Sequence, residues 1–540
     1  MRHRLGGKSA GSLLVALAAW ASPVAAQELT PGVESLIATS KLNGAKIGVS
    51  ILDLSNGHSL ADVRSDAAMI PASNMKLLTS GTALLVLGEE FLFRTEVLID
   101  GDPTKGPVTV ILRGSGDPAL ADPAILDAMS PKMSVDGLVE TLGAGVAKAG
   151  VRRVSSVIVD DRIFDREYVH ASWPKDQLDK WYCAEVCGLN FHTNVISAFP
   201  SPAPEGPSRP PTVAFEPTAP WLEIENRART ITDGSNSVWL ARDPVANRFT
   251  LFGTVRFPAK VPIEITLHEV GTFTGQLIAA ELPRAGVAVG PVPALPSDRS
   301  RLSRSELQDA LATVRLAEAG EALSGRSVAV VTTHIRDVMQ RCNNDSQNLY
   351  AESLIKRIGH DVTGNPGSWT SGSSVVRMTI AQNLGAEYAA STVVSDGSGM
   401  SREDRVAPRT LARWLDALQK NPRFGKEFVE SLATPGDGTL RRRFGDIKLH
   451  GELRAKSGKL DGVRCLSGFL TDHQTGHRVA FSIMVNDMKE GEFAQALQFH
   501  EDVVALIDRW LVSHRPGKPA GASGRKPGKP EYKAVAATSR

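Results

Sequence analysis

Ser73 and Lys76 place a hydroxyl and an amine three positions apart, in the segment Ser73-Asn74-Met75-Lys76. The segment follows Pro71 and begins an apolar run at helical spacing that ends at Gly88, so both side chains are expected on one face at a helix start. A lysine whose pKa is lowered by burial or nearby positive charge can take the proton of a serine hydroxyl and make it a nucleophile. Because Ser-x-x-Lys also occurs by chance in a chain of this length, an ordinary helix start is the alternative interpretation.

Ser346 and Asn348 form a second short motif, Ser346-Gln347-Asn348, at the start of a helical run from Leu349 to Ile358. A hydroxyl and an amide at this position can relay protons and hold a substrate amide. The same two groups can also simply cap the helix.

Lys456, Ser457 and Gly458 form a third motif beside strand-like sequence. A cation next to a hydroxyl can bind a substrate carboxylate, and glycine lets a ligand backbone approach closely. A charged turn is the alternative interpretation.

The elements that must position these residues are predicted from periodicity. Alternating residues over 46–64 predict a hairpin, helical patterns recur over 304–316 and 335–358, strands are expected at 466–470 and 479–485, and a last helix at 493–512. Between about residues 91 and 300 short β-rich runs alternate with turns. The expected fold is therefore one α/β domain, residues 27–90 and 301–513, split by a large β-rich insert, 91–300, of one or two nested lobes.

The two ends of the chain differ from its body in charge. Residues 1–26 carry three basic residues and no acid, a short apolar run and Val24-Ala25-Ala26, which predicts a signal peptide cleaved after Ala26 and hence export. Residues 514–540 carry seven basic residues and one acid among Pro and Gly, which predicts a disordered basic tail. Weak contact of this tail with wall polymer or a membrane surface is one alternative, and a merely solvated tail is the other. The body, with a net charge of −7, is a poor match for nucleic acid.

The four cysteines are Cys183, Cys187, Cys342 and Cys465. Four cysteines in an exported chain allow three disulfide connectivities, and the sequence does not choose among them. Buried thiols or one structural bridge are expected. Cysteine and histidine pairs at zinc-site spacing do not occur, so neither a metal nor a cofactor is expected.

The order Ser-x-x-Lys, Ser-x-Asn, Lys-(Ser/Thr)-Gly is the order found in serine β-lactamases and penicillin-binding proteins. With these motifs the chain resembles the class C low-molecular-mass penicillin-binding proteins, the D-alanyl-D-alanine carboxypeptidase/endopeptidase family. Four further segments are similar to the family's patterns: 114–118, 160–174, 190–191 and 396–402. The resemblance extends over about residues 30–513.

The resemblance implies a β-lactamase/transpeptidase-like domain, with an antiparallel sheet flanked by helices, and a periplasmic serine enzyme inhibited by penicillin. It would cleave peptidoglycan stem peptides through an acyl-enzyme on Ser73. Lys76 would be the base, Ser346 and Asn348 the second motif, and Lys456 and Ser457 the carboxylate site, while backbone N–H groups of Ser73 and Lys459 would form an oxyanion hole. Contacts of Trp173, Asp176 and Arg402 with the stem peptide's diaminoacid are also implied; insert packing and a surface salt bridge are the alternative.

Two features leave the activity partly open. Lys459 stands where the family usually has a small hydroxyl residue, so an extra cation at the mouth of the site could alter substrate preference. The balance of carboxypeptidase and endopeptidase action and the oligomeric state do not follow from the sequence. A β-lactamase or esterase using the same Ser-Lys site, and a non-catalytic wall-binding scaffold, are the alternative functions.

Overall fold

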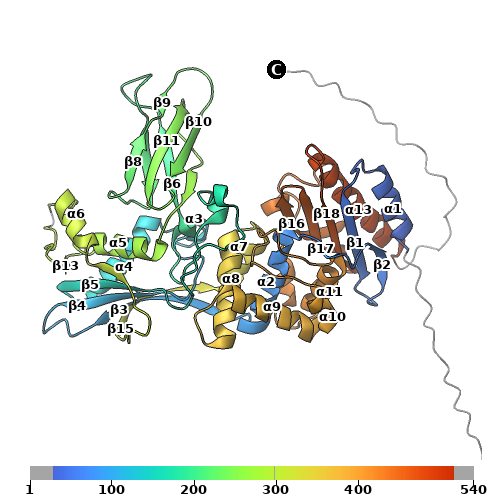
Figure 1. Cartoon of the computed structure of the whole chain (residues 1–540), viewed down its shortest axis with the longest axis horizontal. Helices are drawn as coiled ribbons and strands as arrows, with labels where there is room; N and C mark the ends of the chain where they lie inside the picture. The colour runs from blue at the N-terminus through green and yellow to red at the C-terminus, as the bar shows by residue number, and fades with distance from the viewer. Residues whose placement is uncertain (1–27, 297, 516–540) are drawn as a thin grey trace, which may run out of the picture.

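A computed structural model describes residues 28–296 and 298–515 of the chain, and the fold is elongated, with two parts side by side (Figure 1). The predicted signal peptide, 1–26, and residues 516–540 of the predicted tail lie outside the described residues. The tail prediction is corrected at its first residues. His514 stacks on Trp510 with ring centroids 4.3 Å apart, and Arg515 pairs with Asp472.

One part is built on a five-stranded antiparallel sheet in the order β16-β17-β18-β1-β2. Its strands are β1 (Lys46–Asp53), β2 (Ser59–Val63), β16 (Gly451–Leu460), β17 (Val463–Asp472) and β18 (Arg478–Asn486). Because the central strands are buried on both faces, they consist of nearly continuous apolar and small residues rather than an alternating pattern. The hairpin predicted over 46–64 is present as β1 and β2.

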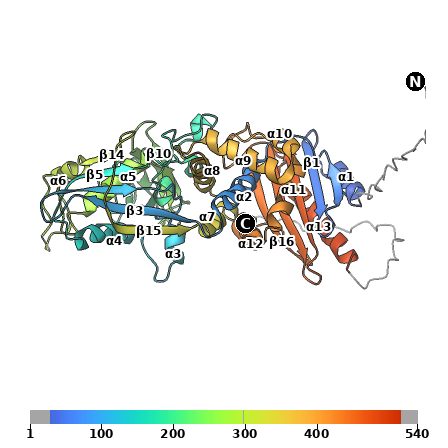
Figure 2. The ribbon, with the colours of Figure 1, turned by 90° about the horizontal axis from the view of Figure 1, so that it is seen from below.

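Helices cover both faces of this sheet (Figure 2). On one face lie α1 (Thr30–Thr39) and α13 (Phe493–Ser513). The other face is covered by the short 3-10 turn η1 (Ala72–Asn74) and by the helices α2 (Met75–Leu87), α7 (Ile335–Asn343), α8 (Asn348–Thr363), α9 (Trp369–Leu384), α10 (Ala386–Ala390), α11 (Pro408–Gln419) and α12 (Gly425–Glu430). The 3-10 turn η5 (Gly438–Leu440) places Leu440 in the core shared with α1 and α13. Helix α2 lies in the middle of this layer and packs on α8 and α11, so the residues at its start are rigidly held.

The inserted part contains a six-stranded mixed sheet (Figure 1). Its strands are β3 (Leu92–Asp100), β4 (Val108–Arg113), β5 (Arg153–Asp160), β13 (Ala288–Val289), β14 (Val314–Leu316) and β15 (Arg326–His334). Four helices accompany them: α3 (Pro123–Ala128), α4 (Val135–Lys148), α5 (Val270–Glu281) and α6 (Arg304–Leu311). Helices α4 and α5 pack against this sheet, so the insert is an α/β unit as well as β-rich.

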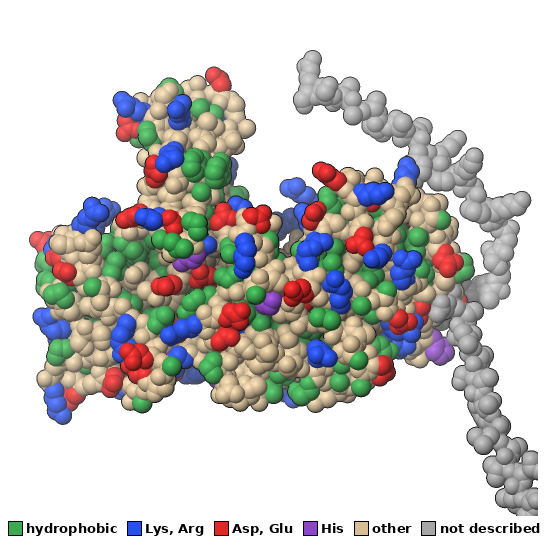
Figure 3. All heavy atoms as spheres, in the orientation of Figure 1, with side chains coloured by type: hydrophobic (Ala, Val, Ile, Leu, Met, Phe, Trp, Pro, Cys, Tyr) green, Lys and Arg blue, Asp and Glu red, His purple; other side chains and the backbone are tan. Residues whose placement is uncertain are grey.

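Two smaller sheets stand on this unit, and the second projects from the molecule as a separate lobe (Figures 1 and 3). The first contains β6 (Val195–Ser201), β7 (Thr212–Glu216) and β12 (Ile263–Thr266), and the second contains β8 (Glu223–Asn226), β9 (Arg229–Thr230), β10 (Ser237–Arg242) and β11 (Arg248–Val255). Three 3-10 turns, η2 (Lys175–Gln177), η3 (Trp181–Cys183) and η4 (His192–Asn194), lie before β6. The whole is an α/β fold in which the domain of the five-stranded sheet is split by a nested insert, as expected.

The expected end of the insert near residue 300 is too early. Strand β14 pairs with β5 and β15 pairs with β3, so residues 314–334 belong to the sheet of the insert. The helix predicted over 304–316 accordingly ends at Leu311, because Val314–Leu316 continues as a strand whose pairing decides its conformation. The helical pattern over 335–358 is two helices, and Ser346 lies in the connection between them.

Among the described residues, no helix combines the length and the apolar character needed to cross a bilayer.

Candidate active site

Ser73 lies in η1, at the start of α2, on a backbone with a sharp turn. Ala72, directly before it, has φ of 47°, a left-handed conformation that non-glycine residues rarely adopt and that recurs at functional sites. Asn74 anchors the turn to the sheet, because its Nδ2 donates to Ser467 Oγ on β17 at 2.8 Å. The Ser73 side chain is therefore presented from a fixed turn and is only half-buried.

Lys76 is fully buried on the first turn of α2, and its Nζ has three partners. It donates to Ser73 Oγ at 3.2 Å, to Asn348 Oδ1 at 2.7 Å and to the Ser398 carbonyl oxygen at 2.9 Å. The amide oxygen and the carbonyl oxygen can only accept hydrogen bonds, whereas a hydroxyl can accept or donate. A neutral Lys76 that keeps both acceptors satisfied therefore directs its lone pair at the Ser73 hydroxyl.

Asn348 is the first residue of α8 and its amide orientation is fixed from both sides. Its Nδ2 donates to the Tyr182 carbonyl oxygen at 2.8 Å, so its Oδ1 faces Lys76. Because Tyr182 belongs to η3 of the insert, this one amide joins the inserted part to the lysine.

Lys456 on β16 and Ser346 in the connection between α7 and α8 form a second amine–hydroxyl pair. Lys456 Nζ donates to Ser346 Oγ at 2.7 Å and to its neighbour's carbonyl oxygen, that of Ser457, at 2.9 Å. Ser346 has φ of 63°, again a left-handed backbone at a non-glycine residue. The structure thus brings together five residues from three distant segments: Ser73, Lys76, Ser346, Asn348 and Lys456.

Burial weakens the basicity of both lysines. Removal from water lowers the pKa of Lys76 to about 8, although nearby anionic groups oppose this shift. The pKa of Lys456 lies well below its usual range because of burial first and the positive charge of Lys76 second. Because this pKa is closer to neutrality than that of an exposed lysine, a larger fraction of Lys76 is the neutral amine that a proton acceptor requires, and this fraction increases up to about pH 8.

Gly458 does not face open space. A Cβ at this position would lie 2.8 Å from the Pro71 carbonyl oxygen and 3.2 Å from Ala72 Cβ. The expectation that this glycine admits a ligand backbone is corrected: it lets β16 pack closely on the turn that carries Ser73. Ser457 is half-buried and Lys459 is exposed.

Trp173, Asp176 and Arg402 do not form one group. The Trp173 ring is 2% exposed, packs near His170 and Trp369, and donates its Nε1–H to Asp396 at 3.0 Å. It is therefore not free to contact a substrate, and the prediction for Trp173 is corrected on this point. Asp176 in η2 and Arg402 are exposed, and Arg402 donates to the Asp461 carbonyl oxygen in the β16–β17 turn at 2.9 Å.

Three buried carboxyl groups lie behind Lys76 and are here called the carboxyl cluster; their grouping was not predicted from the sequence, although Asp396 begins the segment 396–402 noted above. They are Glu352 on α8 and Asp396 and Asp404 in the loop before α11. Glu352 lies four residues after Asn348, and this spacing places both on one helix face, which is the only signal that could have found it.

All four cysteines are buried and none forms a disulfide. Burial raises the pKa of the Cys342 thiol to about 11, against the opposing charges of Lys76 and Lys456. Buried thiols, one of the two expectations, are what the structure contains.

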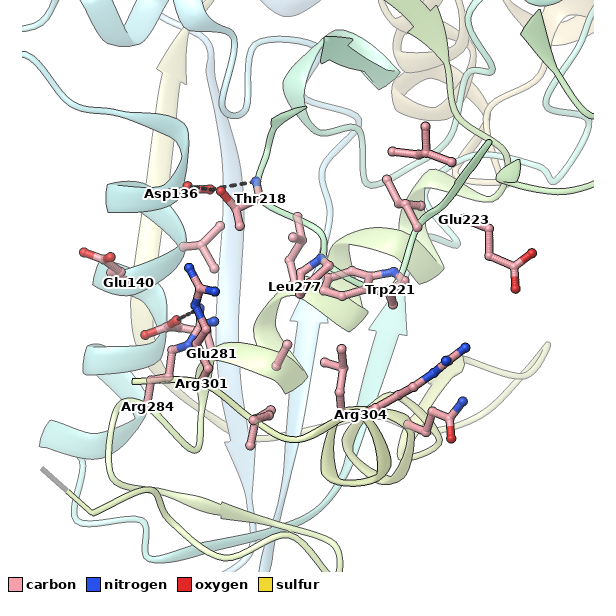
Figure 4. Close-up of a pocket in the computed structure, with 18 residues that line it drawn as sticks. Asp136, Glu140, Thr218, Trp221, Glu223, Leu277, Glu281, Arg284, Arg301 and Arg304 are labelled. Carbon is pink, nitrogen blue, oxygen red and sulfur yellow. Dashed lines mark hydrogen bonds and ion pairs between the residues drawn. The ribbon is translucent and has the colours of Figure 1, made fainter. Parts of the chain in front are cut away.

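A separate cavity of about 940 Å³ lies in the insert (Figure 4). Its walls come from α4, α5, α6 and the chain around β8, and they include Trp221, Glu140, Glu281 and Arg304. None of the five clustered residues lines it, so this cavity is distinct from the candidate active site.

Comparison with known proteins identifies similar chains. The model of the D-Ala-D-Ala carboxypeptidase 3 (S13) family matches residues 29–292 and 302–506. A D-alanyl-D-alanine carboxypeptidase of Actinomadura sp. (strain R39) is 31% identical over 520 residues, which cover 92% of this chain and 86% of the relative. The D-alanyl-D-alanine carboxypeptidase DacB of Haemophilus influenzae is 23% identical over 476 residues, which cover 84% of this chain and 88% of the relative.

Solved structures share the fold. Penicillin binding protein 4 (dacB) of Haemophilus influenzae aligns with a TM-score of 0.68 and 21% identity, covering 88% of this chain and 99% of the other. The same protein complexed with a β-lactam aligns with a TM-score of 0.65 and 20% identity, with the same coverage.

Proposed function

The chain belongs to the D-Ala-D-Ala carboxypeptidase 3 (S13) family, and from this premise we propose that Ser73 is the nucleophile of a serine carboxypeptidase that acts on the D-Ala-D-Ala end of peptidoglycan stem peptides. The observation that carries the proposal is the contact of Lys76 Nζ with Ser73 Oγ at 3.2 Å, together with two acceptor-only partners on the same nitrogen. The lowered pKa of Lys76, about 8, supports its role as the base.

Acylation begins with transfer of the Ser73 hydroxyl proton to neutral Lys76. The Ser73 oxygen then bonds to the carbonyl carbon between the two D-Ala residues, and the carbonyl π electrons move to oxygen. Backbone N–H groups of Ser73, at the helix start, and of Lys459 are the proposed donors to this oxyanion. The C–N bond breaks as the tetrahedral intermediate collapses, and the terminal D-Ala leaves.

The departing amine needs a proton, and the second pair supplies a route for it. Ser346 Oγ accepts a hydrogen bond from Lys456 at 2.7 Å, so its own hydroxyl hydrogen is free to be donated toward the leaving nitrogen. The proton that Lys76 took from Ser73 then passes to Ser346, so that the Ser346 hydroxyl and the neutral amine of Lys76 are both restored. Lys456 and Ser457 are also the proposed partners of the terminal carboxylate.

Deacylation repeats the same chemistry with water. A water molecule gives a proton to the base and its oxygen bonds to the acyl carbon, and Ser73 leaves with a proton restored to its oxygen. The products are the shortened stem peptide and free D-Ala. A β-lactam would acylate Ser73 by the same attack, but its leaving amine stays tethered to the acyl group.

Labelling with fluorescent penicillin tests the proposal. The wild-type chain should form a persistent covalent adduct and Ser73→Ala should form none, because only the Ser73 oxygen is placed to attack. Rapid turnover of the label would instead indicate a β-lactamase or esterase, and absence of any adduct on a folded wild-type chain would indicate a non-catalytic scaffold.

Muropeptide digestion then tests the substrate. Release of free D-Ala from pentapeptides indicates carboxypeptidase action, and cleavage of crosslinked dimers indicates endopeptidase action. Lys459, Asp176 and Arg402 are proposed to influence this balance as exposed charges near the site.

Export to the periplasm is proposed from the predicted signal peptide at residues 1–26, since peptidoglycan lies outside the cytoplasm. Weak contact of the basic tail, now taken as residues 516–540, with anionic wall or membrane surfaces belongs to the same proposal. Raised salt should weaken such contact.

A further inference from the structure

The carboxyl cluster behind Lys76 has no part in the reaction steps above. One of its members, Glu352, is nevertheless connected to Lys76 through the loop that contains Ser398. Glu352 is fully buried on α8 and accepts three hydrogen bonds. Its Oε1 accepts from Ser398 N at 2.8 Å, and its Oε2 accepts from Gly397 N at 2.9 Å and from Trp369 Nε1 at 2.8 Å.

The loop that Glu352 holds is the one that supplies a partner to Lys76. The carbonyl oxygen of Ser398 accepts from Lys76 Nζ at 2.9 Å, while the amide nitrogen of the same residue donates to Glu352. Asp396 restrains the loop from the other side, because its carboxylate accepts from Gly399 N and Ser401 N, both at 2.7 Å. The Ser398 carbonyl is thus fixed in direction by two buried carboxylates.

We propose that Glu352 is a positioning residue for the base: it holds the Ser398 carbonyl against Lys76 and so keeps the lone pair of Lys76 directed at the Ser73 hydroxyl. The inference rests on the proposed roles of Ser73 and Lys76 and extends them to a residue that touches neither substrate nor nucleophile. Without the Ser398 carbonyl in place, one hydrogen of a neutral Lys76 would be free to turn toward Ser73 and the lone pair away from it.

The charge of Glu352 acts on the base as well. Charged and titratable groups face Glu352 from each packed element: Lys76 on α2, Cys342 on α7, Lys356 on α8, and Asp396 and Asp404 in the loop. Burial, and then the charge of Asp396, raises the pKa of Glu352 to about 7. Its anionic form in turn raises the pKa of Lys76, opposing the effect of burial.

Substitution by glutamine separates the two effects. All three partners of Glu352 are donors, so the amide group of Glu352→Gln must set an N–H against another N–H and release part of the loop. We expect the limiting rate of acylation by fluorescent penicillin at high pH to fall roughly 10- to 100-fold, part of the contribution that a well-placed base makes. We also expect the acid limb of the pH–rate profile to move to lower pH, since Lys76 loses a neighbouring anion.

Asp508→Asn is the matched control. Asp508 is 4% exposed on α13, on the opposite face of the sheet, and likewise accepts two consecutive backbone N–H groups, of His450 and Gly451, and one ring nitrogen, His450 Nδ1. It should lose stability while its active fraction keeps the wild-type rate and acid limb. If Glu352→Gln shows no cooperative unfolding, a second variant, Trp369→Phe, decides the question. It removes one hydrogen-bond donor to Glu352 and leaves both backbone amide contacts. The acylation rate of Trp369→Phe should fall, and the acid limb of its pH–rate profile should move to lower pH, as in Glu352→Gln.

A folded Glu352→Gln with wild-type rate and limb overturns the proposal. So does a smaller labelled fraction that reacts at the wild-type rate, which indicates a purely structural role, or an equal change of rate and limb in Asp508→Asn. Failure of the wild-type chain to be labelled at all would instead contradict the proposed function, so the two failures are distinguishable.

Discussion

At Ser73, proton transfer depends on how the three partners of Lys76 Nζ divide its hydrogens and its lone pair. Two of them, Asn348 Oδ1 and the Ser398 carbonyl, accept only, and their distances of 2.7 Å and 2.9 Å are shorter than the 3.2 Å to Ser73 Oγ. The two hydrogens of a neutral Lys76 amine are therefore best donated to Asn348 Oδ1 and to the Ser398 carbonyl oxygen. Because the side chain at position 348 contacts the Lys76 amine, a charge introduced at this position should shift the pKa of Lys76.

Asn348→Asp should move the acid limb of the acylation profile to higher pH. In the wild-type chain the rate should increase tenfold per pH unit below about pH 8 and level off above it, since only neutral Lys76 accepts the proton. An aspartate beside Lys76 stabilises the ammonium form and raises that pKa, and it repels the Tyr182 carbonyl oxygen. Acylation at pH 7 should fall at least about tenfold, measured with fluorescent penicillin.

Asn348→Ala is the control for this prediction, because it removes the same contact without adding a charge. Its rate should also fall, but its limb should not move upward. If the acid limb of the Asn348→Asp profile stayed in place or moved to lower pH, this result would contradict the idea that protonation of Lys76 limits the rate.

The five clustered residues were predictable because each lies in a short motif with a defined order along the chain. Glu352 was not, since its partners Ser398 and Gly397 lie 45 or more positions away and only the fold brings them together. Trp173 was misassigned for the same reason: nothing local indicates that its ring N–H is used by Asp396.

At the scale of elements, the loop at 396–401 and the turn η1 are pressed together. Gly399 has φ of 80°, and a Cβ there would lie 1.8 Å from the Ala72 carbonyl oxygen, directly before Ser73. No side chain fits unless the loop moves away from η1. The approach of these two segments is therefore part of what sets the distance from Lys76 to Ser73.

Gly399→Ala should cost about 2–4 kcal/mol of the free energy of unfolding and should sharply slow acylation. Gly476→Ala is the control: it also has positive φ, 71°, but nothing lies within 4 Å of its Cβ, so only about 1–2 kcal/mol is expected and acylation should be unchanged. Chemical denaturation with parallel labelling measures both. Equal costs in the two variants would show that the contact with Ala72 is unimportant.

Elements with a local signal were predicted, and those decided by pairing were not. The hairpin at 46–64 and the final helix follow from alternation and from a helical apolar face. Val314–Leu316 continues a helical pattern in the sequence but pairs with β5, and β15 returns to β3 across more than 220 positions. Such long-range pairing leaves no trace in a window of a few residues.

For the whole molecule, a buried lysine fastens the insert to the transpeptidase-like domain. Lys356 on α8 is fully buried, donates to Asp165 Oδ1 at 2.7 Å and to the Glu167 carbonyl oxygen at 2.6 Å, and lies 3.8 Å above the Trp369 ring. Its two acceptors belong to the insert. Loss of this ammonium would remove both contacts at the boundary of the two parts.

Lys356→Ala should lower the free energy of unfolding by about 2–4 kcal/mol, because it removes a buried side chain and its contacts while the carboxylate that it leaves, Asp165, is 29% exposed. Lys46→Ala should cost less than about 1 kcal/mol, because its pair with Asp487 is exposed. Thermal and denaturant unfolding compare the two. A Lys356→Ala chain as stable as Lys46→Ala would mean that apolar packing alone holds the insert.

The two ends of the described chain meet behind the sheet. Trp510 Nε1 on α13 donates to Glu28 at 2.7 Å, and α1 and α13 lie together on the face opposite α2 and α8 (Figures 1 and 2). Affinity tags, fluorophores or a surface linkage added next to residue 28 or residue 515 would therefore lie on the α1/α13 side of the five-stranded sheet, opposite the helices α2 and α8. A chain immobilised in this way should keep its serine open to large, insoluble sacculus fragments, which makes wall digestion on a solid support a practical format.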